Sequence, residues 1–307
     1  MKEGSLDAPI RHAVQWQDEN FYSADKLDEE LRRVFDVCHG CRRCFNLCDS
    51  FPKLFDLIDE SDSGELDTVA SADFEPVVDA CTLCDMCYLT KCPYVPPHEF
   101  NIDFPHLMLR YRAVQFRNGQ TPFVNKELTK TDRNGKAFGK IASIVNWGSN
   151  VENSIPRKLL ETTCNVHRDA SLPKFHKKTF LDIDKNRAKS VNSKAPGYGR
   201  RAVVYATCFV NYNNPSIGTS ALDVLNTNGV ETEVVYPSCC GMPQLEQGNI
   251  ADVARAAEKV AKELRSWVDE GNDIITLTPS CALMLKFEWS LILPENEDVK
   301  VLSSATY

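Results

Sequence analysis

Apolar residues recur at helical spacing in the first third of the chain. Positions three and four residues apart predict helices over residues 25–37 and 104–117, with a shorter helix over 74–80. The interval 49–80 begins helical and becomes acidic and rich in Gly and Ser around residues 61–64, which indicates an exposed excursion. We expect the apolar face of 104–117 to be core, the alternative being contact with a membrane surface or a partner.

From residue 200 onward the pattern alternates between strands and helices. Apolar, β-branched runs predict strands over 202–207, 230–236 and 273–278, and helical spacing predicts helices over 215–226 and 250–268. Three strands alternating with two helices imply a small parallel sheet. Residues 120–198 mix Lys, Asn, Gly and Thr with one apolar patch at 141–147, so we expect a connecting region to which no chemistry is assigned.

These patterns predict an α+β multidomain protein. We expect an α-helical domain over 1–119, the connecting region over 120–198, and an α/β domain with βαβαβ order over 199–307. The 307 residues, 43% of them hydrophobic, are enough for two cores. The net charge of -8 offers no basic surface for a phosphate backbone, so nucleic acid is not an expected partner.

The compartment follows from the absence of targeting patterns. The N-terminus has no apolar stretch of a signal peptide, and no apolar run reaches the roughly 18 residues that a spanning helix needs. We expect a cytoplasmic chain. Thiols stay reduced in that compartment, so the 13 cysteines indicate metal rather than disulfides.

Eight of the cysteines form two similar runs, each preceded by a predicted helix. The first run is C-x2-C-x2-C-x3-C and the second is C-x2-C-x2-C-x4-C-P, a spacing typical of [4Fe-4S] ligation. Zinc sites usually present paired C-x2-C knuckles, and a third cysteine so close would not fit tetrahedral zinc. A c-type haem needs C-x-x-C-H, which does not occur. We therefore expect two [4Fe-4S] clusters.

The ligands of each cluster are expected to come from both runs. In two-cluster ferredoxins the fourth cysteine of a run binds the other cluster. This rule assigns the first cluster to Cys38, Cys41, Cys44 and Cys92, and the second cluster to Cys81, Cys84, Cys87 and Cys48.

A third group of thiols follows the predicted strands. Because the carboxyl ends of parallel strands meet at one edge of a sheet, we expect four thiols to converge there: Cys208, Cys239, Cys240 and Cys281. They are a candidate third metal site, for a further Fe–S cluster or for zinc, and the alternative is a buried thiol pair behind a turn. Cys164 is expected to fill core; the alternative pairs it with His167 on one helix face as nucleophile and base.

Five ordered segments carry a resemblance to a known family: CHGCRRCFNLC, CTLCDMCYLTKCP, CFVNYNNP, CCGMPQLEQGN and TPSC. The chain resembles the iron–sulfur subunits of anaerobic glycerol-3-phosphate dehydrogenase, within the heterodisulfide-reductase-related (CCG domain) group of iron–sulfur proteins. The resemblance implies an α-helical ferredoxin domain followed by CCG domains, acting between a flavin-containing dehydrogenase and a membrane quinone. It implies a second CCG half after the present one, and Met284 stands where the family's C-x-x-C ends.

The leading hypothesis is an electron-relay subunit without substrate chemistry of its own. No G-x-G-x-x-G fingerprint occurs, so the flavin is expected on a partner subunit, and the quinone implies a peripheral position on the cytoplasmic membrane face. The first alternative is an enzyme of the heterodisulfide reductase type, with catalysis at the CCG cysteines. The second is a scaffold in which the metal is structural.

Overall fold

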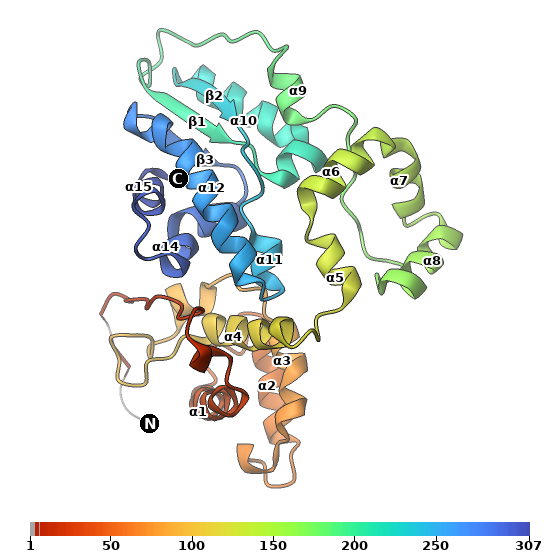
Figure 1. Cartoon of the computed structure of the whole chain (residues 1–307), viewed down its shortest axis with the longest axis vertical. Coiled ribbons are helices and arrows are strands. Elements are labelled where there is room, and N and C mark those ends of the chain that lie inside the picture. Colours follow the sequence, from red (N-terminus) through yellow and green to blue (C-terminus); the bar gives the residue numbers. More distant parts are fainter. Residues whose placement is uncertain (1–3, 6) are drawn as a thin grey trace. The chain divides into compact units, whose positions relative to one another are not determined.

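The chain forms two compact units (Figure 1). The computed structural model describes residues 4, 5 and 7–307. The first unit consists of the described residues up to Thr121 together with Gln244–Ala251. The second unit consists of Pro122–Pro243 and Asp252–Tyr307. Within the described residues, no helix is both long and apolar enough to span a membrane. The domain boundaries expected from the sequence, after residues 119 and 198, stay predictions.

The first unit is helical, as the sequence pattern predicts. Its main helices are α1 (Ala24–Cys41), α2 (Ser50–Asp59), α3 (Glu75–Asp79) and α4 (Phe104–Arg117). A short 3₁₀ helix at Glu19–Tyr22 precedes α1, and 3₁₀ helices at Leu66–Thr68 and Ser71–Phe74 and a π-helical turn at Cys87–Lys91 lie between α2 and α4. Ser23 caps α1 by accepting a hydrogen bond from the N–H of Lys26, and Arg42 ends the helix in the left-handed region with φ of 50°. The helix therefore extends past the predicted end at residue 37 and includes Cys38 and Cys41.

Aromatic side chains fill the core of the first unit. Phe35 of α1 lies edge-on to Phe74, with ring centroids 5.1 Å apart, and Phe51 of α2 lies 4.7 Å from Phe104 of α4. Most apolar residues of α4 are buried, including Leu107, Met108 and Leu109, and Tyr111 and Phe116 are half-buried. The expectation that this helix face is core is confirmed, and its apolar residues are not available to a membrane.

The second unit contains a parallel sheet of three strands in the described part of the chain. They are β1 (Arg201–Tyr205), β2 (Glu231–Val235) and β3 (Asp273–Thr276), in the order β2-β1-β3. Helix α10 (Pro215–Thr227) connects β1 to β2; α11 (Met242–Glu246) and α12 (Ile250–Asp269) connect β2 to β3. The predicted βαβαβ order and the α+β class are confirmed. The crossover from β1 to β2 and the crossover from β2 to β3 run in opposite directions across the sheet, so right-handed connections place α10 and α12 on its opposite faces.

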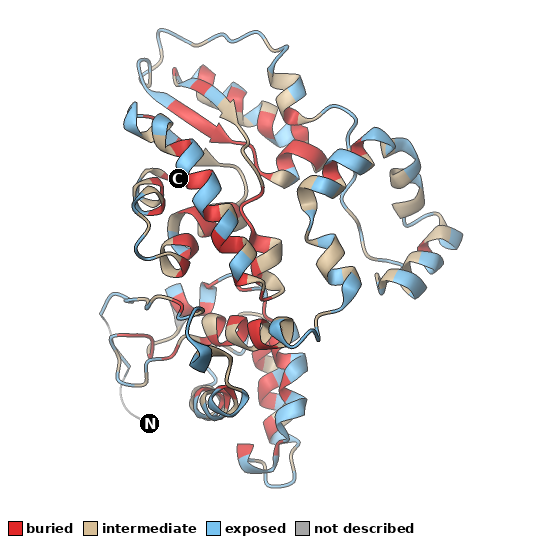
Figure 2. Ribbon diagram, viewed as in Figure 1, coloured by how far each residue is buried: buried red, intermediate tan, exposed pale blue. Residues whose placement is uncertain are grey.

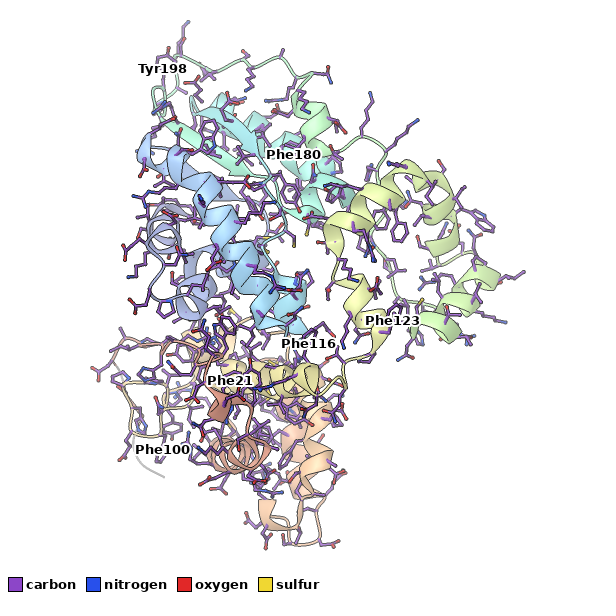
Figure 3. All side chains as sticks on the ribbon, in the orientation of Figure 1. Phe21, Phe100, Phe116, Phe123, Phe180 and Tyr198 are labelled. Carbon is purple, nitrogen blue, oxygen red and sulfur yellow. The ribbon has the colours of Figure 1, made fainter. Side chains whose placement is uncertain are left out.

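One face of the sheet is covered by α9 (Phe180–Asp184) and α10. Phe180 lies in a buried cluster with Val204, Ala206, Val210 and Leu222 and is labelled in Figure 3. Gly218 of α10 allows this packing, because a Cβ there would lie 2.5 Å from the ring of Phe180. Helices α9 and α10 therefore pack tightly on this face of the sheet, close to the edge at which the strands end.

The chain after β3 folds back along the sheet. It forms α13 (Pro279–Leu283), a π-helical turn (Met284–Glu288), α14 (Trp289–Ile292) and α15 (Glu297–Ala305). Tyr307 then donates from its N–H to the carbonyl of Ile274 at 2.8 Å, which begins a further parallel bridge beside β3.

The expected connecting region is largely helical. It contains α5 (Phe123–Leu128), α6 (Thr131–Lys140), α7 (Ala142–Ser149) and α8 (Ser154–Cys164) before α9. Figure 2 shows that α5, α7 and α8 consist almost wholly of exposed and half-buried residues. We refer to residues 122–178 as the helical arm.

Candidate metal centres

The cysteines of the first run lie where α1 ends and α2 begins. Cys38 and Cys41 are on the last turn of α1, Cys44 lies in the turn that follows, and Cys48 precedes α2. The second run forms a tight loop in which Leu83 and Asp85 are left-handed, with φ of 48° and 61°. Such values are uncommon for residues other than Gly, so this loop needs contacts that hold it.

The structure brings the fourth cysteine of the second run to the first run. One apolar pocket is lined by Cys38, Cys41, Cys44 and Cys92, with walls from Phe51, Phe55, Tyr94 and Ile102. Burial raises the pKa of the Cys38 thiol well above its usual value, and the nearby thiols of Cys92, Cys44 and Cys41 raise it further. Four thiols therefore share one enclosed space.

The fourth cysteine of the first run lies correspondingly with the second run. Burial raises the pKa of Cys81 to about 11, and the thiols of Cys48 and Cys84 act in the same direction. Burial also raises the pKa of Cys87, as do the neighbouring thiols of Cys81, Cys44 and Cys48. The two sets are adjacent, because Cys44 of one set lies near Cys87 of the other.

The donor sets fit iron–sulfur clusters. Thiolates in such apolar surroundings are unfavourable without a positive centre, and a four-iron cluster accepts four of them. Tyr88 follows Cys87 in the chain, and its buried phenolic oxygen has no hydrogen-bond partner in the described residues. A buried hydroxyl without a partner is consistent with a bound group, such as a cluster, beside it. A [4Fe-4S] cluster at each set would supply one-electron transfer.

Arg11 fixes the left-handed loop of the second run. Its guanidinium donates to Asp85, with Nη2 and Oδ1 3.0 Å apart, and its Nε donates to Asp103 Oδ2 at 2.8 Å. Asp85 is only 2% exposed, and Asp103 is the N-cap of α4, where it accepts from the N–H of His106. The same guanidinium lies 4.7 Å from the ring centroid of Tyr88. Arg11 therefore compensates the buried charge of Asp85, which follows Cys84 in the chain and acts electrostatically on Cys87.

The third group of thiols meets at the carboxyl edge of the sheet. Cys208 follows β1, Cys239 and Cys240 follow β2, and Cys281 lies in α13 after β3. The Sγ atoms of Cys208 and Cys239 are 3.7 Å apart, and those of Cys240 and Cys281 are 3.2 Å apart. Gly241, with φ of +87°, supplies the left-handed turn that directs both adjacent cysteines inward. No group of three or more His, Cys, Asp or Glu side chains among the described residues is arranged for a single metal ion.

The thiols of this group affect one another's ionisation through shared hydrogen bonds. Hydrogen bonds from the thiols of Cys208 and Cys240 lower the pKa of Cys239 well below its usual value, and the N–H of Gly241 acts in the same direction. The pKa of Cys208 is raised, chiefly by its hydrogen bond to Cys239. The Trp289 indole N–H donates to the carbonyl of Cys240 at 3.1 Å and holds the loop from behind.

Two residues of α6 complete the surroundings of these thiols. Asp132 Oδ2 accepts a hydrogen bond from the N–H of Cys239 at 3.0 Å, and Asp132 Oδ1 accepts one from the hydroxyl of Tyr236. Thr131 faces Cys208 and Cys239, and its buried hydroxyl has no oxygen or nitrogen partner in the described residues. Neither residue could be identified from the sequence, because nothing in the pattern of residues 120–198 marks them.

The structure also bears on two other positions considered in the sequence, Cys164 and Met284. Helix α8 ends at Cys164 and Asn165 is left-handed, so His167 lies beyond the helix. The idea that Cys164 and His167 share one helix face is wrong. Met284 is fully buried at the start of the π-helical turn, three residues after Cys281.

Replacing Asp132 with alanine is expected to destabilise the second unit by about 1–3 kcal/mol, because the buried N–H of Cys239 and the hydroxyl of Tyr236 lose their acceptor. The measurement is the urea midpoint of anaerobic unfolding. Asp169→Ala is the matched control, since Asp169 is exposed in the same arm, and it is expected to change stability by less than about 0.5 kcal/mol. Equal midpoints for the two variants would remove the role assigned to Asp132.

Comparison with known proteins identifies the domain that carries the third group of thiols. Residues 202–286 match the cysteine-rich domain family named CCG. The chain therefore contains a CCG cysteine-rich domain, and the resemblance seen in the cysteine motifs is confirmed. No solved structure matches the chain.

Three curated relatives show the range of similar proteins. The chain is 27% identical over 171 residues to one of the subunits of the anaerobic glycerol-3-phosphate dehydrogenase of Escherichia coli K12, covering 55% of this chain and 42% of that one. It is 28% identical over 159 residues to one of the subunits of the CoM/CoB fumarate reductase of Methanothermobacter marburgensis, covering 49% and 31%. An uncharacterized iron–sulfur protein of Methanococcus maripaludis is 29% identical over 134 residues, covering 42% and 25%. The chain thus spans less than half the length of the curated relatives it matches.

Proposed function

We propose that this chain, a CCG-domain protein similar to subunits of anaerobic dehydrogenases and reductases, is the iron–sulfur electron-transfer subunit of an oxidoreductase complex. It receives electrons from a flavin-containing partner subunit, of the glycerol-3-phosphate dehydrogenase type, and passes them towards a membrane quinone. Its relatives are named as subunits of a dehydrogenase and a reductase, which supports an electron-transfer role and a partner catalytic subunit.

The exchange of Cys48 and Cys92 between the two runs is the observation that carries the proposal. In two-cluster ferredoxins the fourth cysteine of a run serves the other cluster. Here Cys92 lines the pocket of the first run, and Cys48 is among the thiols that raise the pKa of Cys81 in the second. We assign one [4Fe-4S] cluster to each of the two sets.

The residues between the two sets suit transfer from one cluster to the other. A second small apolar pocket is lined by Cys38, Cys44 and Cys92 of the first set and Cys87 of the second, with Phe51, Tyr88 and Phe104. The lining of this space is mostly apolar, and an apolar environment lowers the cost of rearranging solvent when charge moves.

The CCG thiols are proposed as a third centre. Four convergent thiols with the Thr131 hydroxyl facing two of them suit an iron–sulfur cluster, with zinc as the alternative occupant. Met284 takes the place of a fifth cysteine, and a thioether is a poor ligand for iron in a thiolate cluster. This centre is therefore proposed as structural or as a further relay, and not as a catalytic site.

Anaerobically prepared protein is expected to contain about eight iron atoms in the two N-terminal clusters and to absorb broadly near about 400 nm. The measurement combines metal analysis with EPR of the dithionite-reduced protein, and a reversible signal is expected. Cys164→Ser is the control and keeps the full iron content, because Cys164 belongs to none of the three groups. Iron-free protein with stoichiometric zinc would contradict the electron-transfer function.

A further inference from the structure

The helical arm exposes an unusual amount of apolar surface. Six of its large apolar side chains are at least 55% exposed: Phe123, Leu128, Ile144, Trp147, Ile155 and Leu159. Ile144 and Trp147 are three residues apart on α7, and Ile155 and Leu159 are four apart on α8, so each pair shares one face of its helix. Six exposed large apolar side chains within one segment of 57 residues indicate an interaction site, whereas single exposed apolar residues would need no explanation.

The arm has no hydrophobic core of its own. Among the described residues from 122 to 179, no large apolar side chain is buried, which Figure 2 shows along α7 and α8. The buried side chain in α8 is that of Arg157, whose guanidinium donates to the carbonyls of Ser149, His167, Arg168 and Ala170. Polar bonds to the backbone therefore hold α7 and α8 together and leave the apolar side chains facing outward.

The arm is also basic, although the chain as a whole is acidic. Residues 122–178 contain 11 Lys and Arg against 5 Asp and Glu, in a chain of net charge -8. Six exposed lysines of the arm form no ion pair within the described residues: Lys136, Lys140, Lys158, Lys174, Lys177 and Lys178. Positive charge interleaved with exposed Trp, Phe, Leu and Ile matches helices that lie in the interface of an anionic bilayer.

We propose that α5, α7 and α8 form a docking face for an anionic lipid surface. The inference rests on the proposed delivery of electrons to a membrane quinone, and it assigns the surface that makes the contact. The lysines attract the headgroups, and Trp147, Ile144 and Ile155 insert among the acyl chains. Helix α6 attaches this face to the sheet of the same unit, because Asp132 holds the Cys239 loop and Gly135 lies against the ring of Tyr212.

Lipid fits this face better than an acidic protein does. Protein interfaces place their aromatic anchors in well-packed pockets, whereas the apolar residues here spread over three helices with lysines between them. The alternative location for a membrane contact, α4, is excluded because its apolar residues are core.

The test measures binding of the full chain to phosphatidylcholine vesicles with and without about 30% phosphatidylglycerol. The wild type is expected to bind the anionic vesicles at least about tenfold more tightly, and salt is expected to weaken that binding. The variant Ile144→Glu/Trp147→Glu is expected to lose about tenfold or more of this affinity. The control is Val224→Glu, at an equally exposed apolar position (61%) on α10, and it is expected to bind as the wild type does.

The outcomes separate the docking face from the electron-transfer function. If iron-loaded wild type does not bind anionic vesicles, the docking face is overturned and the electron-transfer function stands. If iron-free protein binds them, the docking face stands and the electron-transfer function is overturned. Equal binding of the double variant and the wild type, with far-UV circular dichroism unchanged, also overturns the docking face. The docking face is also overturned if the wild type does not bind vesicles and the double variant no longer binds a catalytic partner subunit, because the face would then be a protein interface.

Discussion

Replacing Cys92 with serine is expected to remove about four iron atoms, those of the cluster proposed at the first cysteine run. Cys92 lies 48 residues or more from the other cysteines of that pocket in sequence, yet it lines the same apolar space as Cys38, Cys41 and Cys44. A serine hydroxyl is a far weaker ligand for iron than a thiolate. The EPR component lost in Cys92→Ser is expected to be the one lost in Cys41→Ser.

The companion substitution Cys48→Ser provides the matched comparison. It is expected to affect the EPR component that Cys84→Ser affects, because Cys48 lies with the second run. If Cys92→Ser instead follows Cys84→Ser, each run holds its own cluster and the exchange of ligands is incorrect. Two separable components are needed for this comparison, and selective loss of iron supplies a second measure of the same assignment.

Substituting Arg11 with methionine is expected to destabilise the first unit by about 3–5 kcal/mol. The carboxylate of Asp85 is almost fully buried, and removal of Arg11 leaves it without its cationic partner beside Cys84 and Cys87. The left-handed backbone at Leu83 and Asp85 loses its support at the same time. The measurement is the anaerobic urea midpoint, followed by far-UV circular dichroism and by loss of iron–sulfur absorbance.

Arg117→Met is the control for a general loss of positive charge. Arg117 is 44% exposed and pairs with Glu19, which is 81% exposed, so its removal is expected to cost less than about 1 kcal/mol. A small effect at Arg11, equal to that at Arg117, would show that the loop of the second run holds its shape without the guanidinium.

The elements with strong periodicity could be predicted from the sequence. The three strands and helices α4, α10 and α12 lie within one or two residues of their expected bounds, because β-branched runs and helical spacing act locally. The convergence of Cys208, Cys239, Cys240 and Cys281 was also accessible, because it follows from the rule that parallel strands end at one edge.

The parts that could not be predicted depend on contacts distant in sequence. Asp132 reaches Cys239 across 107 residues, and Arg11 reaches Asp85 across 74, so neither pair leaves a trace in local spacing. The helices of the arm were missed for a different reason. They are only 6 to 11 residues long, so none of them gives a long periodic run of apolar residues in a region rich in Lys and Asn.

The membership of Gln244–Ala251 in the first unit has a consequence for the order of biosynthesis. Gly248, with φ of +75°, lies so close to α4 that a Cβ there would be 2.3 Å from the backbone carbonyl of Arg112. The ribosome releases the two cysteine runs long before this segment. The first unit consequently cannot reach its final form during translation until residue 251 has emerged, so both cysteine runs stay for that time on a nascent chain whose fold is incomplete.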